Sequence, residues 1–210
     1  MAKNRMYRTE RFRGPLMRVS YAWQLFTPRE ASATSRGGYG CTLIMPKKDD
    51  WSTIQAKIKE CVTNQWGERG AEKWKQGLIK NPIIDGAGKE ARNKETGDLH
   101  PGMGEDVQFI RVASGVDRRP QVYDQNVVLL TDADDCPSGS WGYPVLNAYC
   151  WHNDESGDGV SFGIEMFQLV KKAEGDEILG GGGRAKPEDF LEAVAGATGD
   201  KPESAGDFFG

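Results

Sequence analysis

The sequence predicts a mainly β protein, a small β-barrel or sandwich with one principal helix. Several segments alternate apolar and polar residues with the period of two that is typical of a half-buried strand. One segment, from Asp49 to Gly67, repeats its apolar residues at helical spacing instead. The last two strand segments are joined by the turn-forming stretch NDESGDG at 153–159, and such short connections indicate antiparallel pairing.

Two alternating segments predict the first strands. The first lies between Pro15 and Thr27, where every second residue is apolar: Met17, Val19, Tyr21, Trp23 and Leu25. The second runs from Tyr39 to Pro46, after a Gly/Ser-rich stretch at 31–38, and ends where proline stops the alternation. We therefore expect one long strand and one shorter strand before the helix.

The clearest helix follows Asp49 and Asp50, which can cap its first turn. It ends near Trp66-Gly67, and its apolar residues are Trp51, Ile54, Ile58, Cys61 and Val62. A shorter helix is expected near Ala71–Leu78. The rest of residues 67–104 is rich in charge and glycine, so we expect a long inserted excursion there.

Three further regions complete the predicted sheet. Val107–Ala113 alternates as a third strand, and Gln121–Leu130 can form an extra one. Val145–His152 and Val160–Val170 form the last two, as a hairpin. Residues 1–178 are thus expected to form the main domain, and 179–210 a Gly-rich hinge, a short helix and a flexible acidic tail.

The net charge of −4 is an average over three unlike segments. Residues 1–48 hold ten Lys or Arg against two Asp or Glu, residues 49–173 hold 14 against 20, and residues 174–210 hold three against nine. A basic beginning and an acidic end on one chain point to a nucleic-acid partner. Solvated charge without a ligand remains the alternative.

Several classes of protein are disfavoured. No run approaches the roughly 18 to 20 apolar residues that a membrane-spanning helix needs. The first residues, MAKNRMYRTERFRG, are charged and lack an apolar stretch, so we expect no secretory signal. The four cysteines are then expected to be reduced. We therefore expect a protein without a membrane partner.

Metal and catalytic motifs are weak. The four cysteines never reach a C-x-x-C spacing, and His100 and His152 stand alone, so a structural zinc is not expected. Residues 154–159 with Glu165 match the spacing of a calcium loop, but their flanks alternate as strands. No Ser/His/Asp arrangement or nucleophile elbow is present. We expect no metal, no cofactor and no catalytic residue.

Aromatic and basic residues carry the functional signal, because aromatics in basic, flexible surroundings can stack on unpaired bases. The candidate stacking residues are Trp23, Tyr39, Trp51, Trp141, Tyr143, Tyr149 and Trp151. For Tyr39, Tyr149 and Trp151 a core position is the alternative, whereas Trp141 and Tyr143 fall in the loop-like stretch CPSGSWGYP. The candidate phosphate contacts are Arg13, Arg18, Lys47, Lys48, Arg111, Arg118 and Arg119, together with Arg8 and Arg11.

The C-terminal end combines acidic groups with two aromatics on a tether. Asp207, Phe208 and Phe209 are expected to dock a partner protein, and the acidic tail to compete with DNA for a basic groove. The alternative is an inert solubilising end.

Three segments together resemble a family of bacteriophage single-stranded-DNA-binding proteins. They are RRPQVYD at 118–124, WGYPVLNAYCWHN with GVSFGIEMFQLVKK at 141–153 and 159–172, and the acidic aromatic tail. The resemblance implies an OB-fold, a five-stranded Greek-key barrel with a helix between two strands. It also implies non-enzymatic, sequence-nonspecific coating of single-stranded DNA during phage replication or recombination in the cytoplasm of the infected host. The tail would recruit phage or host replication proteins.

Two departures from the family pattern limit what is carried over. Comparable tails end on an aromatic residue, whereas here Gly210 follows Phe209, which puts a terminal-carboxylate contact in doubt. The excursion at 67–104 is longer than a minimal barrel needs and can border the DNA groove, form a homodimer contact or do neither.

Two other functions remain open. One is a protein-interaction or virion-assembly module on the same small barrel. The other is a metal-dependent nuclease that uses Asp132, Asp134 and Asp135.

Overall fold

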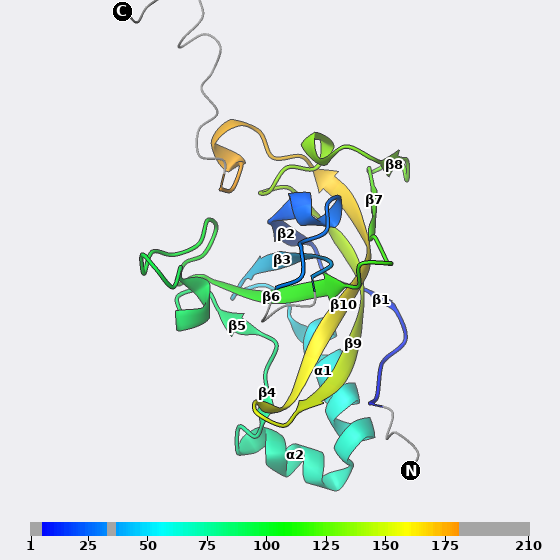
Figure 1. Cartoon of the computed structure of the whole chain (residues 1–210), viewed down its shortest axis with the longest axis vertical. Helices are drawn as coiled ribbons and strands as arrows, with labels where there is room; N and C mark the ends of the chain where they lie inside the picture. The colour runs from blue at the N-terminus through cyan, green and yellow to red at the C-terminus, as the bar shows by residue number, and fades with distance from the viewer. Residues whose placement is uncertain (1–5, 33–36, 181–210) are drawn as a thin grey trace, which may run out of the picture. The chain divides into compact units, whose positions relative to one another are not determined.

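A closed barrel of five strands forms the centre of the protein in the computed structural model, which describes residues 6–32 and 37–180 (Figure 1). The barrel strands are β2 (Met17–Ser20), β3 (Tyr39–Pro46), β6 (Val107–Ser114), β9 (Trp141–Asn153) and β10 (Gly157–Lys171). They pair in the order β9-β2-β3-β6-β10, and a β9–β10 pairing closes the circle. The predicted OB-fold, a five-stranded Greek-key barrel, is confirmed.

One pairing differs from the expectation. The barrel strands pair antiparallel except at β6–β10, where Phe162 faces Val112 in a parallel ladder. The short connections that indicated antiparallel strands join β9 to β10 but do not join β6 to β10. The sequence pattern therefore predicted the strands but not the parallel β6–β10 pair.

The first predicted strand is wrong in length. Only Met17–Ser20 form β2, because the backbone of Tyr21 turns into the left-handed region at φ 57° and starts the 3-10 helix η1 (Ala22–Leu25). Ala22 and Leu25 are buried there, whereas Trp23 is 49% exposed. A further short strand, β1 (Phe12–Arg13), precedes β2 and pairs with β9. The N-terminal segment thus lies along β9 before it enters the barrel.

Two helices lie together at one end of the barrel, the lower end in Figure 1. The predicted helix is confirmed as α1 (Ser52–Trp66), between the second and third barrel strands, and Asp50 Oδ1 accepts a hydrogen bond of 2.8 Å from Ser52 N. The second helix, α2 (Glu68–Lys75), begins three residues earlier than predicted. Gly67, with φ 58°, makes the turn between them.

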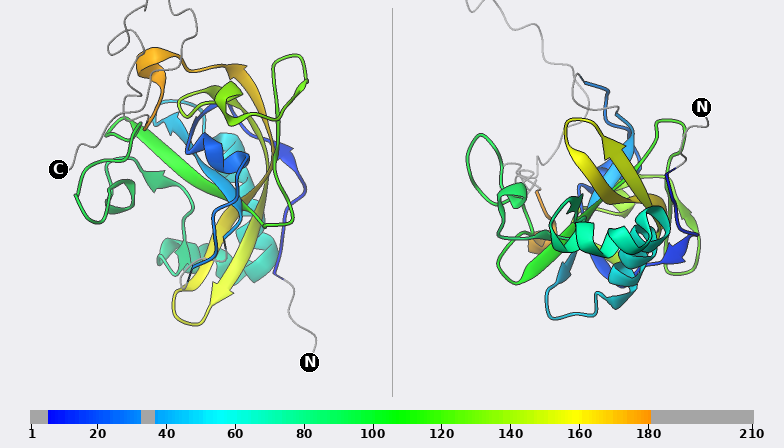
Figure 2. Two further views of the ribbon diagram at one scale, coloured as in Figure 1. Left: turned by 45° about the horizontal axis from the view of Figure 1, so that its top comes forward. Right: turned by 90° about the horizontal axis from the view of Figure 1, so that it is seen from below.

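The predicted excursion at 67–104 is attached to the barrel in two places. After α2, the short strand β4 (Ile79–Lys80) pairs in parallel with β10, and β5 (Ile84–Asp85) pairs antiparallel with β6. The 3-10 helix η2 (Lys89–Ala91) follows, and Figure 2 shows this segment beside the barrel from two more sides. These pairings keep part of the excursion next to the outer edge of β6.

The predicted extra strand at Gln121–Leu130 is a hairpin of two short strands, β7 (Gln121–Tyr123) and β8 (Leu129–Leu130). Asp124 turns the chain, since its Oδ1 accepts hydrogen bonds from the backbone of Asn126 at 2.8 Å and Val128 at 2.7 Å. β7 pairs in parallel with β10. Two more 3-10 helices, η3 (Ala133–Asp135) and η4 (Gly175–Glu177), flank this end.

Strand β9 begins earlier than predicted. Trp141 and Tyr143, which the sequence placed in a loop, belong to β9 and face Lys171 and Gln168 of β10. Gly142 and Pro144 interrupt the alternation that predicts a strand. A Cβ on Gly142 would lie 2.3 Å from the Gln168 carbonyl oxygen. Glycine is therefore required by close strand packing rather than by a loop.

The core lies inside the barrel and under α1. Its largest fully buried side chains include Phe162, Phe167 and Leu146. The four cysteines are free and buried. Within 6–32 and 37–180, none of the helices is long and apolar enough to cross a membrane. The predicted Gly hinge at 180–183 lies almost wholly outside the described residues. The predicted short helix after it and the flexible tail with Asp207, Phe208 and Phe209 lie entirely outside them, so the division at 178/179 stays a prediction.

Candidate nucleic-acid interface

A series of adjoining hollows crosses the barrel over β3, β6, β9 and β10. Four hollows of about 470, 550, 440 and 600 Å³ follow one another, and each neighbouring pair shares lining residues. The first two share Arg8, the middle two share Tyr149, and the last two share Arg111. They form one continuous depression, which we call the basic groove.

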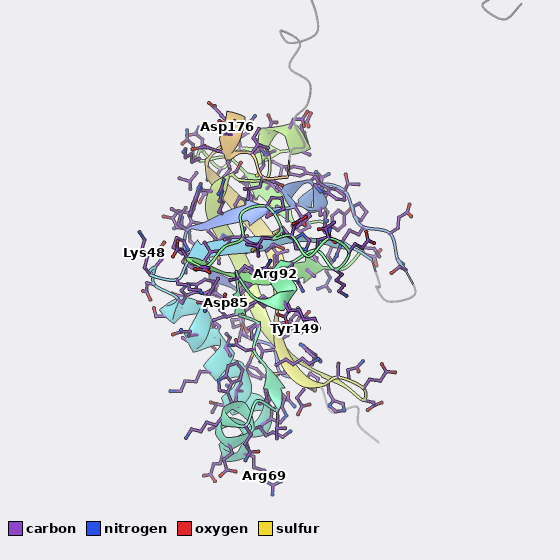
Figure 3. All side chains as sticks on the ribbon, turned by 90° about the vertical axis from the view of Figure 1, so that its left-hand side faces the viewer. Lys48, Arg69, Asp85, Arg92, Tyr149 and Asp176 are labelled. Carbon is purple, nitrogen blue, oxygen red and sulfur yellow. The ribbon has the colours of Figure 1, made fainter. Side chains whose placement is uncertain are left out.

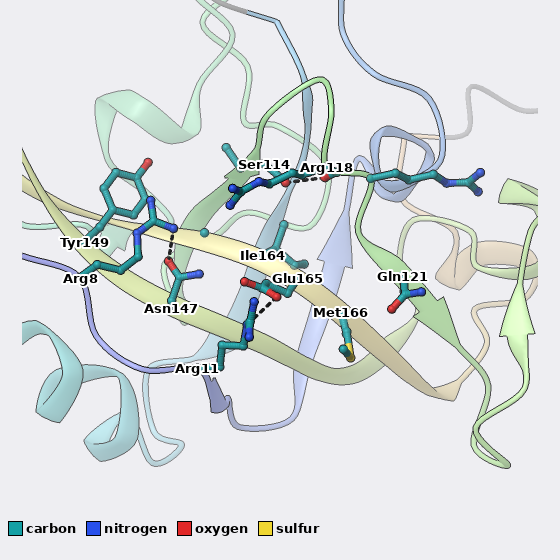
Figure 4. A pocket seen from close by; sticks show the side chains of 13 residues that line it. Arg8, Arg11, Ser114, Arg118, Gln121, Asn147, Tyr149, Ile164, Glu165 and Met166 are labelled. Carbon is teal, nitrogen blue, oxygen red and sulfur yellow. Dashed lines mark hydrogen bonds and ion pairs between the residues drawn. The ribbon is translucent and has the colours of Figure 1, made fainter.

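Arginines from separate parts of the chain meet at one end of the basic groove (Figure 4). Arg8 and Arg11 come from the segment around β1, and Arg118 and Arg119 from the loop between β6 and β7. The guanidinium of Arg8 donates to Asn147 Oδ1 at 3.2 Å. The β6–β7 loop is held in place because the Ser114 hydroxyl donates to the Arg118 carbonyl oxygen at 2.5 Å.

Tyr149 of β9 lies in the middle of the basic groove, at the junction of two hollows. Arg8 lies over its ring, 5.0 Å from the centroid, as Figure 4 shows. On the far side of Tyr149 the wall is formed by Thr42 of β3 and by Arg111 of β6. A partly buried aromatic ring is thus flanked by cations along the groove.

The excursion supplies the other end of the basic groove. Arg111 donates to the carbonyl oxygen of Glu90 at 2.6 Å, which ties β6 to η2. Lys89, Arg92 and Lys94 line the last hollow, and Figure 3 shows Arg92 and Tyr149 on the same side of the molecule. His100 also lines it, and its Nδ1 lies 3.0 Å from the Tyr21 hydroxyl.

The charge of the basic groove is strongly positive. Its lining holds nine Lys or Arg against three Glu. Within the described part of the chain these cations form one ion pair, Arg11 with Glu165 at 2.6 Å. Arg8, Arg111 and Arg119 instead contact neutral amides, carbonyls or aromatic rings, and such partners leave the positive charge uncompensated. The groove is therefore suited to an anionic ligand that runs along it.

A family model for the single-stranded-DNA-binding protein of Enterobacter phage Enc34 matches residues 13–201. The chain belongs to this family. Protein p50 of Acyrthosiphon pisum secondary endosymbiont phage 1 is 28% identical over 166 residues, which is 76% of this chain and 82% of that protein. The resemblance read from residues 118–172 is thus confirmed.

Two solved structures share the fold. The single-stranded-DNA-binding protein from bacteriophage Enc34, in a C-terminal truncation, is 20% identical, with a TM-score of 0.54, over 78% of this chain and 87% of that one. The protein gp2.5 of bacteriophage T7, also a single-stranded-DNA-binding protein, is 16% identical, with a TM-score of 0.53, over 92% of this chain and 98% of that one. The family model and both solved structures are described by single-stranded-DNA binding, which is a non-enzymatic function.

Four of the predicted contact residues line the basic groove of this Enc34-family protein: Arg111, Arg118, Arg119 and Tyr149. Arg8 and Arg11, also named from the sequence, line it as well. Tyr39 lies at the border, opposite Ser114 of the groove wall. Trp23 lies next to Gln24, another lining residue, with half of its surface exposed.

Four other predicted residues lie together at the start of β9: Arg13, Arg18, Trp141 and Tyr143. The guanidinium of Arg13 stacks on Tyr143 at 3.8 Å from the ring centroid. Trp141 faces Arg18 across the β2–β9 pair. Arg18 is engaged by two backbone carbonyls, of Gly139 at 3.1 Å and Glu177 at 2.6 Å, so it fixes the chain after β10. These side chains do not line the basic groove.

The remaining predicted residues have structural partners or lie elsewhere. Trp51 is 5% exposed and donates to the Pro46 carbonyl oxygen at 3.1 Å, so its predicted stacking role is wrong: its ring belongs to the core. Trp151 donates to Ser161 at 2.9 Å and packs over Gly159. Lys47 pairs with Asp85 at 2.7 Å, and Lys48 lies at an edge away from Tyr149 (Figure 3).

Four cations of the basic groove were not predicted from the sequence: three from the excursion and one from the segment after η1. Arg29, Lys89, Arg92 and Lys94 line the basic groove, but nothing in their local pattern distinguishes them from solvated charge. Arg29 belongs to the basic segment 1–48 but was not among the predicted contacts. The others depend on the pairing of β5 with β6, which no local signal predicts.

The carboxylates considered for a nuclease have local roles. Asp132 caps η3 by accepting a hydrogen bond from Asp134 N at 2.9 Å, and Asp135 lies 3.8 Å from Lys172. Over residues 6–32 and 37–180, no group of three or more His, Cys, Asp or Glu could hold a metal ion. Glu165 of the calcium-like spacing belongs to β10, as predicted, and pairs with Arg11.

Proposed function

We propose that this protein binds single-stranded DNA in the basic groove without sequence preference. The observation that carries the proposal is the continuity of the basic groove across the second and third barrel strands, the face on which OB-folds bind oligonucleotides. Uncompensated arginines along it can follow a phosphate backbone. The printed functions of the Enc34 and T7 proteins support the same conclusion.

Base contacts in this proposal come chiefly from Tyr149. Its ring is partly buried at the centre of the basic groove, and stacking on such a ring accepts any base because every base has a π-face. Trp23 and Tyr39 at the border are further candidates. Lack of sequence preference follows from stacking and phosphate contacts, since neither depends on base edges.

The setting of this activity is proposed from the same relatives. Coating of single-stranded DNA would serve phage replication or recombination, in the cytoplasm of the infected bacterium. The protein would then protect exposed strands and keep them accessible to replication enzymes.

A salt titration tests the DNA-binding proposal. Binding of a labelled oligo(dT) is followed by fluorescence anisotropy between 50 and 200 mM salt, and six phosphate contacts would give a slope of about −4 in log K against log salt. Arg118→Ala should make the slope shallower by about 0.7, whereas the matched variant Arg69→Ala on α2 should leave it unchanged. Absence of binding at 50 mM salt would overturn the proposal and favour a protein-interaction module.

The acidic tail is part of the proposal as a recruiting and competing segment. Asp207, Phe208 and Phe209 would dock replication proteins, and the tail's carboxylates would compete with DNA for the basic groove. Removal of residues 200–210 should tighten DNA binding a few-fold at low salt and have little effect at high salt, because salt screens the competition. Equal affinities of the full-length and shortened proteins in low salt would contradict the competition.

The proposed homodimer is a separate question, and sedimentation of the free protein tests it.

A further inference from the structure

Aromatic rings border the middle of the basic groove at both of its ends. The hollow of about 440 Å³ there, which we call the central hollow, meets one neighbouring hollow at Tyr149 and the other at His100. Tyr149 belongs to β9, whereas His100 belongs to the excursion. The volume lies within the range of about 300–1,000 Å³ that is usual for ligand pockets. Rings from two separate parts of the chain therefore border one ligand-sized space.

Tyr21 joins His100 in lining the central hollow. The Tyr21 hydroxyl lies 3.0 Å from His100 Nδ1, and the two rings meet edge to face with their centroids 6.2 Å apart and their planes at 74°. Both residues are partly exposed. Edge-to-face contact is a favoured arrangement of aromatic rings. The hydrogen bond and the ring contact thus fix the two side chains as one unit, which we call the Tyr21–His100 pair.

The backbone of Tyr21 brings its ring to the central hollow. Met17 and Val19 alternate with it along the chain and are fully buried, so a continued strand would send the ring of Tyr21 into the core as well. Tyr21 instead has φ 57° and ψ 37°, a left-handed conformation that is uncommon for a residue with a Cβ. Such conformations are concentrated at binding and active sites, where the surrounding structure maintains them. The turn after β2 is therefore a feature of the groove as well as of the fold.

The excursion holds His100 firmly in its position. His100 N donates to the Ala91 carbonyl oxygen at 2.8 Å, and Met103 N donates to the His100 carbonyl oxygen at 3.0 Å. Ala91 is fully buried with Ile44 and Phe109 of the barrel in a second, small apolar cluster. A ring that is already held in place loses little conformational freedom when a ligand stacks on it. The Tyr21–His100 pair is thus preorganised for binding.

The other surfaces of the central hollow suit a nucleotide. Its apolar lining includes the buried rings of Phe109 and Phe162. Arg29 and Arg111 add positive charge against a single carboxylate among the described lining residues, that of Glu90. Apolar and aromatic surface favours a base, and the arginines favour the phosphates next to it.

We propose that the central hollow is a base pocket, in which one base of a bound single strand lies between Tyr149 and the Tyr21–His100 pair. This inference rests on the proposed function and adds a second stacking surface to Tyr149. Arg29 and Arg111 would hold the phosphates next to that base. The base pocket also gives the excursion a role, because His100 completes a binding surface that the barrel strands alone do not supply.

The two histidines of the chain allow a direct test of the base pocket. Long-range proton–nitrogen NMR spectra of the full-length protein show both imidazole rings, and the His100→Ala variant assigns their signals. On addition of oligo(dT), the His100 signals should move, with the ring protons shifted upfield by the stacked base. The signals of His152, at the end of the β9–β10 hairpin, should stay in place.

Three outcomes of the NMR experiment would contradict the inference. Unchanged His100 signals, with DNA binding established by anisotropy, would overturn the base pocket and leave the DNA-binding proposal intact. Equal changes at His100 and His152 would indicate a general change of the protein and would also overturn the base pocket. Absence of any oligo(dT) binding would overturn both proposals.

A matched set of variants separates base stacking from a structural role of His100. His100→Ala should weaken oligo(dT) binding about fivefold or more, because one stacked base is lost, and His100→Phe should restore most of the affinity because a ring remains. A strand of abasic residues offers phosphates without bases, so both variants should bind it as the wild type does. His152→Ala replaces the other histidine and should leave both affinities unchanged.

The same variants can overturn the stacking assignment. If His100→Phe loses as much affinity as His100→Ala, the hydrogen bond to Tyr21 matters and the ring does not. If His100→Ala loses equal affinity for oligo(dT) and for the abasic strand, His100 contacts phosphates or maintains the shape of the groove. Either result would contradict a base stacked on the Tyr21–His100 pair.

Discussion

The basic groove and the end of the β9–β10 hairpin use charge in opposite ways, although both are built from the same two strands. Among the described residues, Arg11 forms the one ion pair of the nine groove cations, whereas Arg8, Arg111 and Arg119 contact neutral partners. At the hairpin end, Asp158 accepts from Lys73 at 2.6 Å and lies 2.8 Å from His152 Nδ1. Cations there are compensated by carboxylates. The difference shows that the negative total of the middle of the chain leaves the proposed DNA-binding face positive.

The strongest test of this contrast reverses charge in the basic groove. The double variant Arg111→Glu, Arg118→Glu should weaken oligo(dT) binding about 100-fold or more at 50 mM salt, because it replaces two phosphate contacts by repulsion. The control, Lys48→Glu with Arg69→Glu, makes the same change of charge away from the groove and should lower affinity only slightly. Anisotropy titrations measure both. Equal losses would mean that net charge, and not the groove, governs binding.

The next test concerns the aromatic centre of the basic groove. Tyr149→Ala should weaken binding about tenfold, since stacking on one base contributes about 1–3 kcal/mol. Tyr149→Phe should restore most of the affinity because the ring remains. Tyr143→Ala removes a ring that lies on the same face of β9 but does not line the basic groove, and should have little effect. A larger loss from Tyr143→Ala than from Tyr149→Ala would place the bases farther along β9, outside the basic groove.

The smallest effect is expected at the hairpin end, and it concerns stability. The hydrogen bond with Asp158 raises the pKa of His152 against a smaller opposing effect of burial, and a weaker hydrogen bond with Asp154 adds to the rise. A raised pKa means that the protonated ring stabilises the fold fully below about pH 6.5, and that this contribution is lost as the pH rises through the folded-state pKa. His152→Gln should therefore lower the melting temperature at pH 5.5 but not at pH 8.5.

The titration of the neighbouring Asp158 does not affect the comparison between pH 5.5 and pH 8.5. Burial acts to raise the pKa of Asp158, but hydrogen bonds from Lys73 and His152 outweigh it and lower the pKa. A lowered pKa gives stability that is present above about pH 3.9 and lost only in acid, so it is constant between pH 5.5 and 8.5. A difference between wild type and His152→Gln that grows with pH would contradict the assigned hydrogen bonds.

The parts of the fold that the sequence predicted are those with strong local periodicity. The alternation of Tyr39–Pro46 and the helical spacing after Asp50 were interpreted correctly. The prediction of one strand over Pro15–Thr27 is wrong beyond Ser20. Tyr21 has a left-handed backbone there, and the apolar alternation of the sequence does not indicate it. The loop prediction for Trp141 and Tyr143 is wrong because the local sequence was misleading. Gly142 and Pro144 are typical of loops, but the pairing of β9 with β10 keeps them in the strand.

The candidate site was predicted in part for the same reason. Residue type alone singled out Arg111, Arg118 and Tyr149, which meet only through long-range strand pairing. Trp51 has the same chemistry, but its burial depends on how α1 packs. Arg92 and Lys94 reach the groove only because β5 pairs with β6. Local sequence thus identifies candidate chemistry, and tertiary pairing decides which candidates share a surface.

The closing pairs of the barrel have a consequence for folding during synthesis. Met17 of β2 pairs with Gly142, and Val112 of β6 pairs with Phe162, so the barrel joins residues about 125 and 50 positions apart. Contacts between such distant residues form late, because loop closure costs entropy before the contacts are made. On the ribosome, the apolar face of β2, β3 and β6 should stay exposed to solvent until the β9–β10 hairpin emerges. The groove would then be assembled only after β10 has left the ribosome.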